Sequence, residues 1–288
     1  MEMMNKDFAV FILTHGRPDN VITIETLKKC GYTGKLFLVI DNEDKTAEQY
    51  YKNFGRDKVI MFDKKKYADE CDECNNFDER RTITMARNAC FDIAKKVGVT
   101  YFIQLDDDYT HFYYTSDTEL KYRSDHKSIK KINNIFNYFL EFYKSNNYKS
   151  IAFAQGGDFI GGEGSSVWTK KMARKCMNSF ICSTERPFKF IGAMNEDVNT
   201  YTTRGSRGDL FITIAWIRLE QKRTQSQGGG ISEMYDKFGT YCKAFTTVIN
   251  MPSSVKVSKM GVSDMRIHHK INWKNTVPKI ISEDLKKK

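Results

Sequence analysis

The stretch YFIQLDDD, residues 101–108, decides the interpretation of this sequence. Its apolar run predicts a short buried strand, and three consecutive carboxylates follow at the end of that strand: Asp106, Asp107 and Asp108. Adjacent like charges repel, so the arrangement is costly unless a cation lies among them. In open α/β sheets ligands bind at the carboxyl ends of the strands, and a hard divalent cation that holds a phosphate suits such a cluster. A solvated acidic turn is the alternative, since Asp is common in turns.

Strands and helices alternate through the residues that precede this stretch. Apolar runs predict buried strands at 8–14, 35–41 and 58–62. Helices are expected between the strands, with capping or glycine signals at their ends, over residues 20–30, 47–54 and 82–97. Such alternation favours an α/β fold with a mainly parallel sheet and helices on both faces.

The second half is less regular and shows no repeat and no domain linker. We expect helices at 128–145 and 232–245, a hairpin formed by 111–115 and 121–123, and strands at 150–155, 210–219 and 265–273. The stretch GGDFIGGEGSS, residues 156–166, has five glycines in eleven residues. Glycines of this density either adopt positive φ angles or let a ligand approach the backbone. The simplest organisation is one domain, residues 1–288, with an elaborated C-terminal half.

Composition limits the class of protein. The chain of 288 residues carries a net charge of +10, which suits a partner with many phosphates. We expect no membrane span, because no apolar run of about 18 residues occurs, and no secretory signal. Seven scattered cysteines favour free thiols in a reducing cytoplasm over a disulfide framework. Cys71 and Cys74 have the spacing of half a zinc site, but no second pair completes it.

Polar residues at the other predicted strand ends belong to the same edge of the sheet. Thr14 and Arg17 follow the first strand, Asp41 ends the second, and Arg87 lies on the helix that precedes the acidic stretch. A parallel sheet would bring them together. Arg17 could then contact a phosphate or base, and Asp41 could accept hydrogen bonds from a nucleoside. Each residue also has an ordinary structural interpretation, as a turn residue, a strand-end acid or a solvated helix residue.

In this order, these elements resemble the GT-A fold glycosyltransferases, which bind nucleotide sugars. The resemblance covers roughly residues 8–110 and rests on the first-strand turn THGRP, the second-strand acid, the Ala-Arg-Asn helix and the acidic cluster. It implies that 1–110 is the nucleotide-binding half and 111–288 the acceptor-binding half. It also implies a metal, Mn²⁺ or Mg²⁺, on the diphosphate of a donor such as a UDP-sugar. The implied donor contacts are Thr14, Arg17, Asp41, Arg87, Asp106 and Asp107, with Asp106 and Asp108 as metal ligands.

Two later motifs complete the resemblance. Glu196 and Asp197 look like the acidic pair where many inverting members keep their general base, and a carboxylate there could take a proton from an acceptor hydroxyl. An acidic pair at a helix N-terminus is the structural alternative. The motif His268-His269-Lys270 resembles the C-terminal histidine that completes the metal shell. Alternation along the strand turns only one histidine inward. We favour His268, with Lys270 neutralising phosphate.

A closer resemblance concerns the acceptor. The stretches THGRPDN, VIDNEDKT, QLDDDY, MNEDVNTYTTRG and MRIHHKINW are similar to the TET-associated glycosyltransferases of bacteriophages and to the transferase that makes base J. These act on hydroxymethylated pyrimidines in DNA, so DNA is the implied partner and the host cytoplasm the implied setting. Basic side chains would track the phosphates and aromatic ones would hold a flipped base. The candidates for DNA contact are Lys170, Lys171, Arg174, Lys175, Arg204, Arg207, Arg223, Lys256 and Lys259.

Other functions stay open at this point. The same donor chemistry could serve a polysaccharide, a protein or a small molecule as acceptor. A nucleotidyltransferase is disfavoured, because the first-strand turn is too poor in glycine. A non-catalytic, basic DNA-binding protein is disfavoured because unpaired acids are costly to bury. The sequence leaves the identity of the sugar, the stereochemistry of transfer and the oligomeric state undetermined.

Overall fold

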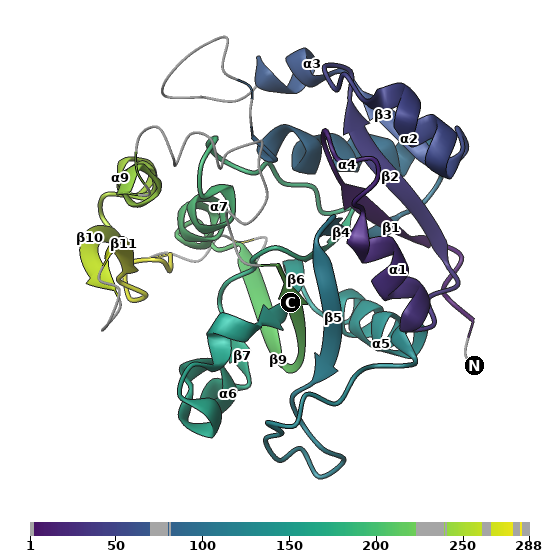
Figure 1. Cartoon of the computed structure of the whole chain (residues 1–288). Helices are drawn as coiled ribbons and strands as arrows, with labels where there is room; N and C mark the ends of the chain where they lie inside the picture. The colour runs from purple at the N-terminus through teal and green to yellow at the C-terminus, as the bar shows by residue number, and fades with distance from the viewer. Residues whose placement is uncertain are drawn as a thin grey trace.

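Four parallel strands form one half of the central sheet in the computed structural model, in the order β3-β2-β1-β4 (Figure 1). Their bounds are β1 (Phe8–Leu13), β2 (Lys35–Asp41), β3 (Val59–Phe62) and β4 (Tyr101–Asp106). The structure describes residues 3–69, 80, 82–222, 239, 241–260, 266–278 and 283. All four strands predicted for this half are present, and their parallel pairing is confirmed. Since β1 and β4 lie side by side at the point where the strand order reverses, their carboxyl ends flank the crevice in which α/β sheets bind ligands.

Helices cover both faces of these strands. The helices of the first half are α1 (Ile22–Lys29), α2 (Ala47–Phe54), α3 (Lys64–Ala68) and α4 (Thr84–Lys96). Strand β1 divides its side chains between two buried clusters, because successive residues of a strand point to opposite faces. Phe8, Val10 and Ile12 pack with side chains of α1 and α5 (Ile132–Lys144). Ala9, Phe11 and Leu13 pack with side chains of α3 and α4.

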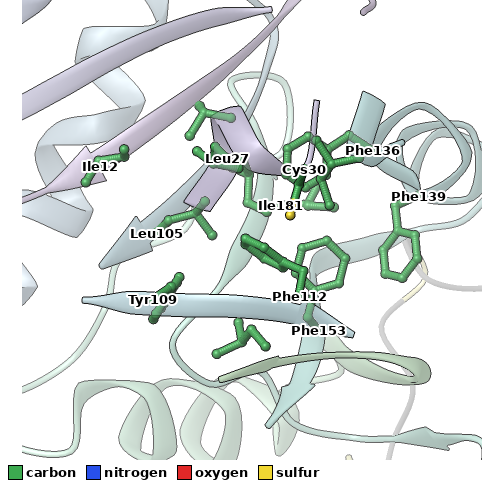
Figure 2. Close-up of a cluster of buried hydrophobic side chains, with 14 of the residues drawn as sticks. Ile12, Leu27, Cys30, Leu105, Tyr109, Phe112, Phe136, Phe139, Phe153 and Ile181 are labelled. Carbon is green, nitrogen blue, oxygen red and sulfur yellow. The ribbon is translucent and has the colours of Figure 1, made fainter. Parts of the chain in front are cut away.

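The first of these clusters is rich in aromatic rings (Figure 2). Phe136 on α5 lies 5.7 Å from Phe8 and 5.9 Å from Phe153, measured between ring centroids. Phe112 meets Phe153 edge to face at 5.9 Å. Edge-to-face and offset ring pairs stabilise a core beyond the area they bury. The cluster therefore packs side chains from both halves of the chain against one another.

The second half adds antiparallel strands, so the whole sheet is mixed. Within the described residues, the sheet has nine strands and continues from β4 as β8-β6-β9-β5, with β7 paired to β9. These strands are β5 (Tyr109–Tyr114), β6 (Tyr148–Gln155), β7 (Met172–Ala173), β8 (Phe180–Ser183) and β9 (Leu210–Gln221). Because β8 is antiparallel to both β4 and β6, those two run in the same direction. The carboxyl end of β6 therefore lies at the same edge as the acidic cluster.

Short helices and a separate ribbon complete the second half of the chain. The glycine-rich stretch forms η1 (Gly156–Phe159) and η2 (Gly162–Gly164) and leads into α6 (Ser166–Lys170). Helix α7 (Glu196–Gly205) lies beside α9 (Tyr241–Asn250), which packs against the two-stranded ribbon of β10 (Val255–Met260) and β11 (Arg266–Ile271) (Figure 1). No helix in the described ranges is long and apolar enough to cross a membrane.

Two predictions of local structure need correction or restriction. The hairpin expected from residues 111–115 and 121–123 is confirmed only near its turn, where Ser116 bridges Tyr122 and the N–H of Arg123 donates to the carbonyl of Thr115 at 2.9 Å, while β5 itself pairs with β9. The helix expected at 232–245 is described only from Tyr241, and there it extends to Asn250. Cys71 and Cys74 lie outside the described residues.

Candidate functional site

Asp107 fixes the turn that follows the first strand. The register of β1 and β4 pairs Leu13 with Asp106, which sets the residues after each strand end side by side. Thr14 Oγ1 donates to Asp107 Oδ2 at 2.7 Å, and Arg17 Nη1 lies 3.4 Å from Asp107 Oδ1. The Asp107 side chain is buried by these contacts. The three residues come together as predicted, with the carboxylate directed at the turn.

Asp41 lies in a second charged group at the end of β2. Its Oδ2 is 2.7 Å from His15 Nδ1, and its Oδ1 is 3.4 Å from the buried Lys64 Nζ. Although burial opposes it, the bond to His15 and the charge of Lys64 hold the pKa of Asp41 below its usual value. The same hydrogen bond raises the pKa of His15. A carboxylate that bonds to His15 and lies beside the ammonium group of Lys64 is an ionised acceptor held in one orientation.

Arg87 joins the two acidic regions of the chain. Its Nη2 donates to Asp106 Oδ1 and its Nε to Glu196 Oε1, each at 3.0 Å. Only 2% of the residue is exposed, and the guanidinium carbon lies 4.7 Å from the ring centre of Phe180. Burial by itself would lower the pKa of Arg87, but the charges of Asp106 and Glu196 raise it above its usual value. Acids 90 residues apart in the sequence therefore converge on one buried cation.

One nitrogen of this guanidinium, Arg87 Nη1, is buried and has no hydrogen-bond partner in the described structure. Buried donors almost always have a partner, so this atom marks a place where a ligand or water completes the site. The prediction that Arg87 contacts the nucleoside stays a prediction. What the geometry adds is a second role, as the link between Asp106 and Glu196.

Helix α4 holds the segment that leads to Glu196. Thr84 Oγ1 donates to the carbonyl of Gly192 at 2.7 Å. Asn88 accepts from the backbone N–H of Phe190 at 2.8 Å and donates to its carbonyl at 3.3 Å. Gly192 has a φ of +81°, and a Cβ there would lie 2.8 Å from Asn199 Nδ2. The position therefore requires glycine for both its backbone and its neighbours.

Asp197 lies in the first turn of α7, behind Asn195, whose left-handed backbone (φ 58°) begins the helix. Its Oδ1 accepts from the N–H of Val198 at 2.7 Å. Burial and the neighbouring Glu196 raise the pKa of Asp197 to about 6, against the smaller effect of Lys243. A carboxylate with a pKa near the working pH is suited to general-base catalysis. The alternative prediction, that Glu196 and Asp197 are simply an acid pair at a helix N-terminus, also fits their position on α7. It gives no reason for the burial of Asp197.

Asp108 is the acid of the cluster with the strongest electrostatic need for a cation. Burial and the charges of Asp106 and Asp107 raise its pKa to about 7. Carboxylate oxygens crowded in this way suit Mg²⁺ or Mn²⁺, which take oxygen ligands. Among the described residues, no three His, Cys, Asp or Glu side chains are already placed to hold a metal ion. The ligand set of Asp106, Asp108 and a histidine therefore stays a prediction.

One of the two histidines of β11 contacts the residue that begins α7. His269 Nδ1 lies 3.2 Å from Asn195 Nδ2, whereas His268 Nδ1 bonds to the carbonyl of His269 at 2.8 Å. Both side chains are half-buried and their ring centroids lie 4.2 Å apart, so the preference for His268 as the metal ligand stays a prediction. Burial and the charges of His268 and Lys243 lower the pKa of His269 to about 4. A neutral imidazole at pH 7 can act as a metal ligand.

Lys270 and the predicted DNA-contacting residues fall into separate places. Lys170, Arg174 and Lys175 line one groove, whereas Lys171 lies over the ring of Trp168 and Arg204 pairs with Asp209 at 2.6 Å. Arg207 lies in the turn after α7. Lys256 and Lys259 lie on β10, and Lys256 is directly opposite Lys270 in the ribbon. Arg223 lies outside the described residues.

Several site residues were missed by the sequence analysis. His15 follows Thr14 in a turn that was already singled out, so its position was an available signal. Lys64 begins a run of three lysines, which is typical of a solvated helix end, and only the fold shows that it is buried. Asn195 and Tyr201 flank Asp197 on α7, and no local pattern distinguishes them from ordinary polar and core residues.

Comparison with known protein families gives a match over most of the chain. The model of the family described as TAGT, TET-Associated Glycosyltransferase, matches residues 8–230. No curated protein matches in sequence. Two similar solved structures are of glucosyl-3-phosphoglycerate synthase from Mycobacterium tuberculosis, one with Mg²⁺ and UDP and one with Mn²⁺, UDP and phosphoglyceric acid. Each is 10% identical with a TM-score of 0.46, over 93% of this chain and 88% or 87% of that chain.

A third similar structure is S. aureus TarS 1-349, at 11% identity and a TM-score of 0.42, covering 86% of this chain and 66% of that chain. Likenesses this distant carry no information about the ligands of the present chain. The family match, together with the mixed, mainly parallel sheet flanked by helices, is the finding that identifies the chain.

Proposed function

The chain belongs to the TET-associated glycosyltransferase family and is a glycosyltransferase, and on that premise we propose that it moves a sugar from a nucleotide-sugar donor, best a UDP-sugar, to the hydroxyl of a hydroxymethylated pyrimidine in DNA. The biological setting that fits is hypermodification of bacteriophage DNA in the host cytoplasm. The observation that carries the proposal is the buried link from Asp106 through Arg87 to Glu196, at 3.0 Å on each side. It supports one site in which a donor-side acid and an acceptor-side acid act together.

The donor would lie across the carboxyl ends of β1, β2 and β4. Asp41, held by His15 and Lys64, offers an ionised acceptor to the nucleoside. Arg17 and the unpartnered Arg87 Nη1 offer donors to the diphosphate or the ribose. Asp106 and Asp108, with one of the adjacent histidines His268 and His269, would hold Mn²⁺ or Mg²⁺. A divalent cation there would neutralise the charge that develops on the departing nucleoside diphosphate.

The acceptor hydroxyl would approach from the side of α7. Asp197, buried and with a pKa of about 6, is ionised at neutral pH and can remove the proton of that hydroxyl as its oxygen attacks the sugar. Glu196, fixed by Arg87 Nε, orients this first turn and keeps a second negative charge beside Asp197. That charge raises the basicity of Asp197. A direct attack of this kind inverts the sugar stereochemistry.

The experiment that tests the proposal combines a panel of nucleotide sugars with three DNA substrates in the presence of Mn²⁺. The substrates are DNA with hydroxymethylcytosine, DNA with hydroxymethyluracil, and unmodified DNA as the control. Mass spectrometry of the digested nucleosides should show one hexose or pentose added to one hydroxymethylated base, and no addition to the control. Addition should cease in Asp197→Asn and on chelation of the metal. Transfer to a polysaccharide, protein or small molecule, with none to any DNA, would overturn the DNA acceptor and keep the donor chemistry.

A further inference from the structure

A groove with a volume of about 540 Å³ lies on the acceptor-side half of the chain. Its walls come from η1, α6, the segment around β7, and the C-terminal turn that contains Trp273, with Lys170, Arg174 and Lys175 as its cations. Among the described residues that line the groove, Asp158 is the one acid, so three cations face one carboxylate. The groove is thus positively charged before any partner binds.

The groove adjoins the site without overlapping the acidic cluster. Strands β4 and β6 are separated by β8 alone, which places their carboxyl ends two strand spacings, about 10 Å, apart. The groove begins just after β6, at Gly157 and Asp158. A nucleotide-sized ligand in it could therefore present one group toward a donor held at the end of β4, and would leave the donor site itself free.

Tyr201 connects the groove to the proposed base. It lies one helical turn after Asp197 on α7, and its ring stacks on Trp273 at a centroid distance of 5.9 Å and an angle of 15°. Burial, and then the negative charges of Asp197 and Asp158, raise the pKa of Tyr201 well above its usual value. The ring pair of Tyr201 and Trp273 therefore joins the helix that carries Asp197 to the wall of the groove.

The three cations of the groove make different contacts. Arg174 frames the groove, because its Nη2 donates to the carbonyl of Trp273 at 2.8 Å and its guanidinium lies 5.5 Å from the Trp273 ring centre. Lys175 pairs with Asp158. Lys170 is exposed and, within the described part of the chain, makes no ion pair or hydrogen bond through its ammonium group. It is the cation available to an incoming phosphate.

Apolar surface is also exposed in this groove. Ile160 is 84% exposed, Met172 43% and Trp273 37%. Aromatic and apolar faces beside a cationic track are the combination that binds unpaired nucleotides, since every base has a face that stacks and every link carries a charge.

We propose that this groove holds the displaced acceptor nucleotide and the adjoining DNA strand, with phosphate at Lys170 and a base against Trp273, so that the hydroxymethyl group points past Tyr201 toward Asp197. The inference rests on the proposed function and adds the place where the DNA binds. It selects three of the nine predicted DNA contacts as the acceptor track, and it assigns Trp273 and Tyr201 to acceptor positioning. The enzyme would bind the base out of the duplex, as enzymes that modify bases generally must.

The test compares Lys170→Glu with Lys52→Glu, an exposed lysine of α2, which follows β2 near the opposite end of the sheet. Transfer to hydroxymethylated DNA is measured as a function of DNA and salt concentration. Lys170→Glu should raise the KM for DNA about tenfold and reduce the slope of log KM against log salt by about one, since one phosphate contact is lost. The KM for the nucleotide sugar is measured alongside. Equal KM values for DNA in the two variants would contradict DNA binding in the groove.

A second pair of variants distinguishes loss of DNA binding from loss of folding. Trp273→Phe keeps a ring against Tyr201, whereas Trp273→Ala removes it, and thermal melting reports whether each variant is folded. If the ring holds the base, Trp273→Ala should lower kcat/KM at least tenfold and Trp273→Phe should restore most of it. No change in either variant would contradict base binding there. If the wild-type enzyme transfers nothing to any DNA, the proposed function itself fails, which is a different outcome from a wild-type enzyme that works and variants that match it.

Discussion

The two sides of this molecule treat charge in opposite ways. At the carboxyl ends of β1, β2 and β4, acids are matched by cations of the chain itself, as in the pairs of Asp41 with Lys64 and of Asp106 with Arg87. In the second half of the chain, cations exceed acids among the described residues that line the groove, and the ribbon sets Lys256 directly opposite Lys270. Like charges directly opposite each other in a sheet are destabilising.

This difference separates the charges that the fold itself pairs from the charges that a bound ligand must neutralise. The matched side is built to hold a few groups in fixed positions, with Asp108 as the acid still in need of a cation. The unmatched side gains nothing from its own positive charge and is stabilised only when an anion binds. Substitutions on the first side should therefore change stability and chemistry, while those on the second should mainly change binding.

The largest expected effect comes from removing the cation of the matched side. Arg87→Met leaves Asp106 and Glu196 buried without their shared partner, so we expect a loss of about 3–5 kcal/mol of unfolding free energy, measured by urea denaturation. Arg56→Met is the matched control, since Arg56 pairs with Glu48 at 3.1 Å on an exposed surface. Such surface pairs contribute about 1 kcal/mol or less. Equal losses in the two variants would show that Arg87 is no structural link.

The role of Asp197 can be tested through the pH dependence of catalysis. If it is the base, kcat/KM should fall about tenfold per unit as the pH drops below about 6, because the proton then occupies the carboxylate. Asp197→Asn should lower kcat by about 10²–10⁴. A pH profile that stays flat between pH 5 and 7 would exclude Asp197 as the base.

Stability should change with pH in the opposite sense. The pKa of Asp197 is raised to about 6 in the folded protein and is about 3.9 in an unfolded chain. The stability that comes from its bound proton is therefore complete below about pH 4 and is lost as the pH rises through 6. Asp197→Asn should then stabilise the protein at pH 7.5 by on the order of 3 kcal/mol, measured by urea denaturation. A destabilised variant would contradict the unfavourable burial of this acid.

Gly192 tests whether the turn before Glu196 is held as tightly as the geometry indicates. Gly192→Ala adds a Cβ 2.8 Å from Asn199 Nδ2 at a φ of +81°, whereas Gly98→Ala has a φ of +68° with nothing within 4 Å. Backbone strain alone should cost about 1–2 kcal/mol in Gly98→Ala, and Gly192→Ala should lose more. Thermal or urea denaturation of both variants measures the difference. Equal losses of unfolding free energy in the two variants would show that the turn at Gly192 can adjust to the added Cβ.

The smallest effect is expected on the ribbon. Lys256→Glu replaces a like-charge pair by an attractive one with Lys270, so the protein should gain about 0.2–1 kcal/mol in unfolding free energy. If the ribbon contacts DNA, the same variant should bind DNA more weakly, which a fluorescence anisotropy titration measures. A more stable protein with unchanged DNA affinity would remove the ribbon from the DNA interface and leave the groove as the binding surface.

The sequence predicted the parallel half of the sheet well, because a buried parallel strand is a continuous apolar run with a clear start and end. Residues 101–108 therefore placed the acidic cluster at a sheet edge correctly. Parallel pairing also predicted that Thr14 would lie near Asp107, and the register of β1 and β4 explains why.

The sequence could not predict which charged side chains pair with one another. Arg87 carries the pattern of a helix residue, and its contacts with Asp106 and Glu196 depend on how α4 docks against the segment before α7. His268 and His269 alternate on one strand, so the pattern gives two faces and no means to tell which one packs inward. The groove is assembled from η1, α6, β7 and the turn at Trp273, which are more than 100 residues apart at their extremes.

Binding of UDP in the presence of Mn²⁺ tests most directly whether the acids at the end of β4 form the donor site. Calorimetric titration of the wild-type protein should show UDP binding that strengthens with Mn²⁺, and Asp108→Asn should weaken the Mn²⁺-dependent affinity at least tenfold. A variant that binds UDP with Mn²⁺ as tightly as the wild-type protein would contradict the placement of the donor at residues 106–108.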